Sequence, residues 1–274
     1  MDDVQLLAPR EVPLGGPRAM TVRRTLPSRQ RSLVGAWCFL DHYGPDDVAA
    51  TGGMAVPRHP HTALATVSWL FTGEIEHRDS TGAHAMARPG ELNLMTAGRG
   101  VSHSEFSTPA TSVLHGVQLW FALPSSARDE EPSFVHHVPE PMYVPGGVAR
   151  VFLGELLGVR SPVRTHTPIT GAEILLDADA ETLVEVPAGH EHALLLDDGD
   201  VTVDGPGLAA TALAAGLVDE IAPVVVPAGM GAPIAMPEEA PASESPGAHD
   251  VAAKPADLSM DPLSPTDTPY ETPP

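Results

Sequence analysis

The chain has almost no cysteine and few basic residues. Cys38 is the only cysteine among 274 residues, which excludes a disulfide within the chain and fits a reducing compartment. Lysine and arginine total 15 against 36 aspartate and glutamate residues, so the formal net charge is −21. Because a charge of this sign repels a phosphate backbone, the composition disfavours direct binding to nucleic acid.

Long apolar runs are also missing. No stretch is apolar for long enough to cross a membrane as a helix. The N-terminal residues, MDDVQLLAPREV, begin with two acids after the methionine and lack the basic and apolar regions of a secretory signal. We therefore expect a soluble, cytoplasmic protein that does not bind membranes, and we expect a monomer. The length allows one large domain or two ordinary ones.

Aromatic residues are few and unevenly distributed. Eleven of the twelve lie from Trp37 to Phe152, and the twelfth is Tyr270. The first half of the chain therefore contains most of the bulky side chains that define the shape of a core. The second half relies on alanine, valine and leucine, which specify packing less sharply.

Short apolar runs separated by turn residues fill the region from 34 to 123. Runs such as TVSWLFTGEIEHRDS (66–80) are rich in β-branched and aromatic residues, and no long stretch has the apolar period of a helix. This pattern predicts an all-β sandwich or barrel. A connector with four prolines follows at about 125–145, and a second β unit of similar kind follows it.

The later part of the chain gives weaker signals. In the second unit, ALLLDDGDVTVDG (193–205) indicates a hairpin. The segment 207–217 is ambiguous, because its alanines favour a helix while its flanking glycines favour irregular structure. Residues 237–274 hold nine prolines, eight acids and one base, Lys254. That composition cannot bury enough apolar surface to offset chain ordering, so we predict a disordered acidic tail.

Two pairs of metal-ligating residue types are the most informative feature. His59 and His61, and then His103 and Glu105, are each separated by one residue. On a β-strand such residues point to the same face, so two facing strands would bring three imidazoles and a carboxylate together. This donor set leaves up to two positions of an octahedron open, which is typical of a catalytic or ligand-binding metal. The absence of thiolate ligands argues against structural zinc.

Other histidines are less informative. His190 and His192 form a second pair of the same spacing, but no partner pair follows them, so a solvated loop is the better interpretation. His136 and His137 lie in the connector and are expected at the surface. His77 either points inward near the metal or caps a hairpin.

Two further residues are candidates to line a substrate pocket. Gln118 and Trp120 share one face of the strand predicted at 112–124. Both could face a ligand, although a tryptophan in such a setting more often belongs to the core. Together with His77 they complete the predicted set of pocket residues.

Four longer segments resemble the pirin family of the cupin superfamily. They are WCFLDHYGPDD (37–47), RHPHTALATVSWLFTGEIEHRDS (58–80), RPGELNLMTAGRGVSHSE (88–105) and LHGVQLWFALP (114–124). The resemblance is dense over about 18–160 and weaker up to about 236. It implies two tandem cupin barrels: a metal-binding domain at 1–130 and a cupin-like domain without a metal site at 131–236. The acidic tail at 237–274 follows them.

The resemblance also implies a function. It implies an iron-dependent dioxygenase that acts on flavonols of the quercetin type, with dioxygen as the second substrate. His59, His61, His103 and Glu105 would bind Fe(II), and Glu105 would also be catalytic as a proton acceptor. Spacing alone does not separate iron from manganese, nickel, copper or zinc. An alternative is an iron-dependent redox sensor that binds a transcription factor or a metabolic enzyme, since an acidic surface suits a protein partner.

The chain departs from the family pattern at two places. Ala63 and Ala65 stand where relatives commonly have glycine and glutamate. Pirins usually finish with a tryptophan-rich strand and a helix, whereas GAPIAMPEEAP (231–241) leads directly into the proline-rich tail. This difference raises a third hypothesis, a truncated or frameshifted pirin whose second barrel is impaired.

Overall fold

The protein is built almost wholly of β-strands. The structure is a computed structural model that describes residues 5–14, 20–186, 190–199, 201 and 210–214. These residues form nineteen strands and one short helix, which confirms the all-β fold class. Within them, no helix has both the length and the apolar character needed to cross a membrane. The predicted tail at 237–274 lies outside the described residues.

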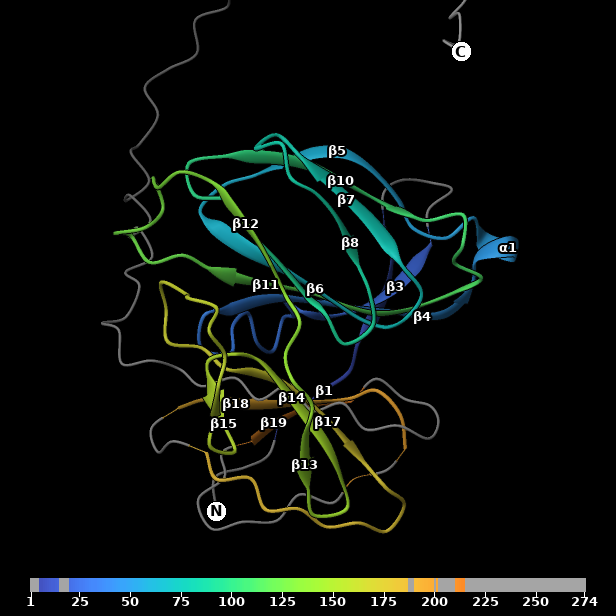
Figure 1. Cartoon of the computed structure of the whole chain (residues 1–274), viewed down its shortest axis with the longest axis vertical. Coiled ribbons are helices and arrows are strands. Elements are labelled where there is room, and N and C mark those ends of the chain that lie inside the picture. The colour runs from blue at the N-terminus through green and yellow to red at the C-terminus, as the bar shows by residue number, and fades with distance from the viewer. Residues whose placement is uncertain (1–4, 15–19, 187–189, 200, 202–209, 215–274) are drawn as a thin grey trace, which may run out of the picture. The chain divides into compact units, whose positions relative to one another are not determined.

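The first β unit consists of a seven-stranded and a four-stranded antiparallel sheet (Figure 1). The larger sheet has the spatial order β12 (Ser133–His137), β9 (Leu92–Thr96), β6 (Leu64–Thr72), β11 (Val113–Ala122), β4 (Trp37–Asp47), β3 (Thr21–Leu26) and β2 (Arg10–Pro13). The smaller sheet has the order β5 (Ala55–His61), β10 (Val101–Ser107), β7 (Ile75–Asp79) and β8 (His84–Ala87). Helix α1 (Val48–Thr51) connects β4 to β5 and is capped by the Asp47 carboxylate, which accepts from the Ala49 N–H.

The central strands of the seven-stranded sheet are buried on both faces, and β11 shows how the sequence arranges this. Val117, Leu119 and Phe121 alternate along the strand and belong to one apolar cluster. The intervening side chains of Gln118 and Trp120 therefore point to the opposite face, toward the four-stranded sheet. Both faces of β11 are consequently specified by a period of two, apolar on one side and mixed on the other.

The apolar cluster on the first face continues into the second half of the chain. Its members include Trp69 of β6 together with Phe152, Ile169 and Leu195. The Trp69 and Phe152 rings stack with centroids 4.5 Å apart, and the Trp69 indole N–H donates to Glu173 Oε1 at 3.4 Å. The second β unit, which is poor in aromatic residues, thus packs the Phe152 ring of β14 against Trp69 of the first unit.

The second β unit contains three small sheets. One is antiparallel, with the order β13 (Met142–Val144), β14 (Gly147–Leu153) and β17 (Gly171–Leu176). A second pairs β15 (Glu155–Leu156) with β16 (Val159–Arg160). In the third, β19 (Ala210–Ala214) lies between β1 (Gln5–Leu7) and β18 (His192–Leu196) and runs parallel to both.

The structure describes parts of three segments for which the sequence signals were weak or incomplete. The described part of 207–217, residues 210–214, forms strand β19 rather than a helix or irregular structure; pairing with two strands overrides the helix propensity of alanine there. The connector predicted at 125–145 contains two strands, β12 and β13. The first strand of the hairpin predicted at 193–205 is β18, and most of its second strand lies outside the described residues.

Two strands pair across the domain boundary that the sequence predicted at residue 130. Strand β12 follows that boundary and pairs with β9 of the first unit. Strand β1 lies at the other end of the chain and pairs with β19 of the second unit. The division into 1–130 and 131–236 therefore stays a prediction.

The turn before β10 depends on Gly98. This residue has φ +51, and a Cβ there would lie 2.1 Å from the carbonyl oxygen of Glu130. Gly82 is a matched control, because its φ is +94 while no atom lies within 4 Å of the Cβ position. We expect Gly82→Ala to lower the free energy of unfolding by about 1 kcal/mol and Gly98→Ala by about 2–3 kcal/mol. Denaturant unfolding measures both, and equal losses would show that the Glu130 contact is readily absorbed.

Candidate metal centre

One face of the four-stranded sheet gathers most of the predicted site. In the ladder between β5 and β10, His59 is paired with His103. On the other side of β10, His103 is paired with Asp79 and Glu105 with His77 of strand β7. Since alternate residues of a strand share a face, one surface carries six polar side chains. They are His59, His61, His77, Asp79, His103 and Glu105, and all except His59 are buried.

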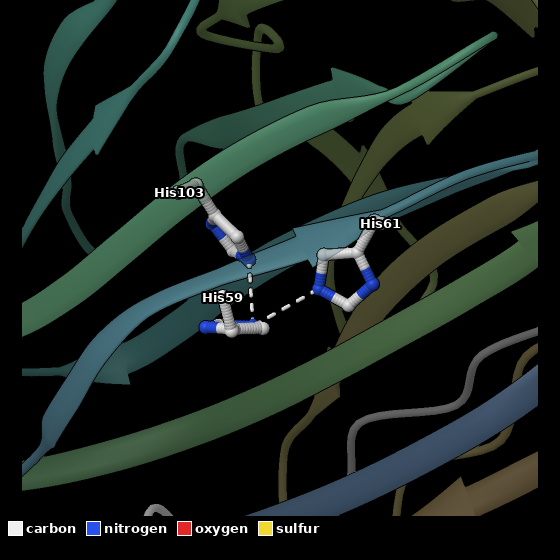
Figure 2. A group of neighbouring side chains, drawn as sticks. All are labelled: His59, His61 and His103. Atoms are coloured by element: carbon white, nitrogen blue, oxygen red, sulfur yellow. Dashed lines mark hydrogen bonds between the residues drawn. The ribbon is translucent and has the colours of Figure 1, made fainter. Parts of the chain in front are cut away.

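Three imidazoles from β5 and β10 converge on one point (Figure 2). The Nε2 atom of His59 lies 3.0 Å from Nε2 of His61 and 3.1 Å from Nε2 of His103. Ligand nitrogens about 2 Å from a common ion are separated by roughly 3 Å, so the spacing fits a shared metal ion. The two strands thus bring together the three histidines that the sequence selected.

The electrostatics of the cluster also suit a metal. Burial lowers the pKa of His61 to about 4, and the neighbouring imidazoles of His103 and His59 add to the effect. Burial likewise lowers the pKa of His103 to about 3, with further contributions from His59 and His77. Both rings are therefore neutral at pH 7, and a neutral imidazole offers the lone pair that a metal requires.

Glu105 lies near the three imidazoles but makes a bond of its own. Its Oε1 accepts a hydrogen bond from the Ser68 hydroxyl at 3.0 Å, and that hydroxyl is also 3.1 Å from Gln118 Oε1. The Glu105 carboxylate groups most closely with His77 and His103 rather than with all three converging imidazoles. It is thus placed beside the cluster, and its role as a ligand stays a prediction.

A small cavity of about 40 Å³ opens beside the cluster. Its walls include the three converging histidines, Glu105 and two of the predicted pocket residues, Gln118 and Trp120. The Trp120 ring stacks on Phe39 at 3.8 Å with an interplanar angle of 9°, and meets the His61 ring edge-on at 4.8 Å. His77, the third predicted pocket residue, is not among the lining residues and lies next to His103.

An arginine supports the aromatic wall of this cavity from the side. The Arg24 guanidinium lies 4.3 Å from the centre of the Phe39 ring. It also donates two hydrogen bonds of 2.7 Å to the Asp41 carboxylate, which lines the same cavity. Burial raises the pKa of Asp41, and the bonds from Arg24 oppose that effect. The wall formed by Phe39 and Trp120 is therefore held in a fixed geometry.

Sequence reasoning missed Asp79, although the signal was present. His77 and Asp79 have the same one-residue spacing as the ligand pairs, and their side chains lie 3.3 Å apart. Burial raises the pKa of Asp79, but hydrogen bonds from Thr81 and His77 outweigh it, so the pKa lies below its usual value. Asp79 is thus a buried carboxylate within the same group of histidines.

A second cluster had no signal in the sequence. Asp197 Oδ1 lies 2.6 Å from His42 Nε2 and 2.8 Å from His115 Nε2. These side chains come from β4, from β11 and from the residue after β18, and 82 positions separate His115 from Asp197. Only the fold brings them together, so no local spacing could have predicted the cluster.

The remaining histidines behave as separate residues. The rings of His190 and His192 are 6.5 Å apart, and within the described residues no third ligand type joins them. His136 and His137 lie on the edge strand β12, where His136 Nδ1 is 2.7 Å from Asn93 Oδ1. Neither pair resembles the convergence seen on β5 and β10.

Comparison with known proteins gives the same family as the motifs. Residues 19–121 match the sequence profile of the Pirin family. A Pseudomonas aeruginosa protein named "Putative quercetin 2,3-dioxygenase PA1205" is 43% identical over 213 residues, which cover 77% of this chain and 67% of that protein. A "Pirin-like protein" of Caulobacter vibrioides is 38% identical over 196 residues, 67% of each chain.

A solved structure supports the fold. The crystal structure of quercetin 2,3-dioxygenase from Acinetobacter baumannii matches with a TM-score of 0.67 and 37% identity, over 70% of this chain and 64% of that chain. The chain therefore spans about two thirds of the length of these relatives. The fold class of tandem cupin units is confirmed, and the chain belongs to the pirin family.

Proposed function

We propose that this pirin is a metal-dependent dioxygenase that acts on flavonols of the quercetin type. The observation that supports this most directly is the convergence of three imidazoles, those of His59, His61 and His103, at the wall of a cavity. Two relatives whose names include quercetin 2,3-dioxygenase, at 43% and 37% identity, support the reaction class. A cytoplasmic location and a monomeric state stay predictions.

The three histidines would hold the ion, and Glu105, whose carboxylate groups with His103 and His77, would complete the donor set. A bound Fe(II) ion would supply a Lewis acid that lowers the pKa of a substrate hydroxyl and a position at which dioxygen meets the substrate. Fe(II) is our proposal for the native ion, because an imidazole and carboxylate donor set with open positions suits non-haem iron.

The surrounding side chains would orient the flavonol and take its proton. Glu105, buried beside the cluster, is the base that would accept the proton of the 3-hydroxyl group, and the Ser68 hydroxyl fixes one of its oxygens. The cavity of about 40 Å³ is far smaller than pockets that enclose a drug-sized ligand, which run to several hundred Å³. Only the metal-binding edge of the flavonol would therefore enter, and its rings would lie toward the aromatic wall of Phe39 and Trp120.

The test is oxygen uptake by protein of defined metal content. Metal-free protein is reloaded without oxygen with Fe(II), Mn(II), Ni(II), Cu(II) or Zn(II), and dioxygen consumption is followed after addition of quercetin. We expect uptake that requires both a redox-active ion and quercetin, with zinc-loaded protein inactive, because zinc has no redox chemistry. The same concentration of free ion is the blank, since metals alone oxidise flavonols. If oxygen uptake by the protein is no faster than this blank, whichever ion is bound, the proposed reaction is refuted.

A further inference from the structure

A line of three buried side chains runs away from the metal cluster. On the side of His103 remote from His59, the Nδ1 atom lies 3.4 Å from Nδ1 of His77. The other ring nitrogen of His77, Nε2, lies 3.3 Å from Oδ2 of Asp79. Both contacts are at the long end of hydrogen-bond distances. The exposed fractions of His103, His77 and Asp79 are 1%, 3% and 6%, so water competes little for these atoms.

The orientation of Asp79 is fixed by its other oxygen. Oδ1 accepts hydrogen bonds from the Thr81 N–H at 2.8 Å, the Thr81 hydroxyl at 2.6 Å and the Ala83 N–H at 3.1 Å. These three donors belong to the turn between β7 and β8. They hold Oδ1 in the turn and leave Oδ2 as the atom that faces His77.

Counting protons along the line gives one arrangement of neutral rings. A carboxylate can only accept, so the Nε2 atom of His77 carries the hydrogen. In its neutral form the His77 ring has one N–H, so its Nδ1 is then an acceptor, and Nδ1 of His103 donates to it. The lone pair of His103 is therefore on Nε2, the atom that faces His59 in the metal cluster.

We propose that Asp79 and His77 are positioning residues that hold His103 in the tautomer whose Nε2 binds metal. The inference rests on the metal site of the proposed function, but not on the substrate or the reaction. Partners of this kind fix the tautomer and the ring orientation of a ligating histidine. We call the two contacts from Asp79 through His77 to His103 the relay. His77 also stacks on the Phe134 ring, with ring centroids 4.7 Å apart, so a purely structural role in the core is the competing explanation.

The decisive variant is Asp79→Asn. The three donors at Oδ1 keep the amide oxygen in the turn and place the amide NH₂ against His77 Nε2. The amide donates where the carboxylate accepted, so His77 must accept at Nε2 and carry its hydrogen on Nδ1. His103 then accepts at Nδ1 and carries its hydrogen on Nε2, where it blocks metal binding. The substitution thus reverses the relay without changing the size of the side chain.

The primary measurement is the tautomer of His103 in metal-free protein, read from the ¹⁵N signals of its imidazole by nuclear magnetic resonance. We expect an Nδ1–H tautomer in the native protein and an Nε2–H tautomer in Asp79→Asn. The second measurement is affinity for Co(II), whose visible spectrum reports its ligands, and we expect a loss of about 10–100-fold. Neither measurement uses quercetin or dioxygen, so failure of the proposed reaction would leave both results standing.

A matched control separates the relay from the turn. Thr81→Val removes one hydrogen bond to Oδ1 of the same carboxylate and leaves Oδ2 facing His77. We expect this variant to melt at a lower temperature but to keep the His103 tautomer and the Co(II) affinity. If Asp79→Asn does not fold, His77→Phe removes the relay and keeps an aromatic ring against Phe134. Unchanged Co(II) affinity in the tested variant, or a loss of affinity in Asp79→Asn without a change of tautomer, would overturn the proposal.

Discussion

Replacing His59 and His61 together by alanine is expected to remove tight metal binding and quercetin-dependent oxygen uptake. Both side chains present Nε2 to the shared point, so the double variant leaves His103 alone from the converging cluster. Four-ligand zinc sites bind with roughly 10–16 kcal/mol, or about 3 kcal/mol for each ligand. Loss of two ligands should therefore weaken binding by at least about a thousandfold, as measured by metal content and by titration with Co(II).

The chain supplies its own control for this experiment. His190 and His192 have the same spacing, so the double alanine variant there makes the same change in composition. Their rings are 6.5 Å apart, and no further ligand type joins them within the residues that the structure describes. We expect that variant to retain native metal content and oxygen uptake. If both double variants lose metal to the same extent, or if the His59 and His61 variant keeps its metal, the assignment of the metal site to these histidines is wrong.

The convergence of His59, His61 and His103 was predictable because the spacing of residues on a strand determines the direction of their side chains. Residues two apart on β5 and on β10 share a face, which is all that the histidine pair and the His-x-Glu pair require. The sequence did not reveal that Glu105 would bond to Ser68 or that His77 would contact His103. Both contacts run between strands, and they depend on a register that no single strand encodes.

The fold was predictable to a similar degree. Period-two patterns identified the long central strands, whereas no such pattern predicted β12, which lies in a segment rich in proline and charged residues. Pro132 and Pro139 bracket that strand, which pairs only at the edge of the sheet, where neighbouring prolines do not disrupt a ladder. The parallel pairing of β19 with β1 joins segments about 200 residues apart, and no local pattern encodes it.

The hypothesis of an impaired second barrel can be tested at Asp197. If this part of the chain is not folded onto the first unit, Asp197 has no partners and its replacement will leave stability unchanged. In the structure Asp197 is buried and its Oδ1 bonds to His42 and His115 of the first unit. Arg23 adds a positive charge beside His42 and donates to the Gly44 carbonyl oxygen at 2.8 Å.

We expect Asp197→Ala to lower the free energy of unfolding by about 3–5 kcal/mol, because it leaves buried polar partners and a nearby guanidinium uncompensated. Denaturant unfolding measures the loss. His84→Ala is the control, since its exposed ring pairs with Glu76 at the surface and an ion pair between exposed side chains contributes little to stability. Similar stability of both variants would favour an impaired second unit.

Acid unfolding provides an independent check with a defined direction. Burial raises the pKa of Asp197, but the bonds from His115 and His42 outweigh it and lower the pKa from 3.8 to about 2. A depressed pKa means that the folded state favours the charged form. The associated stability, about 2 kcal/mol, is therefore fully present above pH 4 and is lost as the pH falls toward 2. In Asp197→Asn this component of the pH dependence should be absent, so the difference in unfolding free energy between native protein and variant should shrink on acidification. A difference that stays constant from pH 6 to pH 3 would show that Asp197 does not link the two β units. In that case the second unit would not stabilise β11, the strand that carries Gln118 and Trp120.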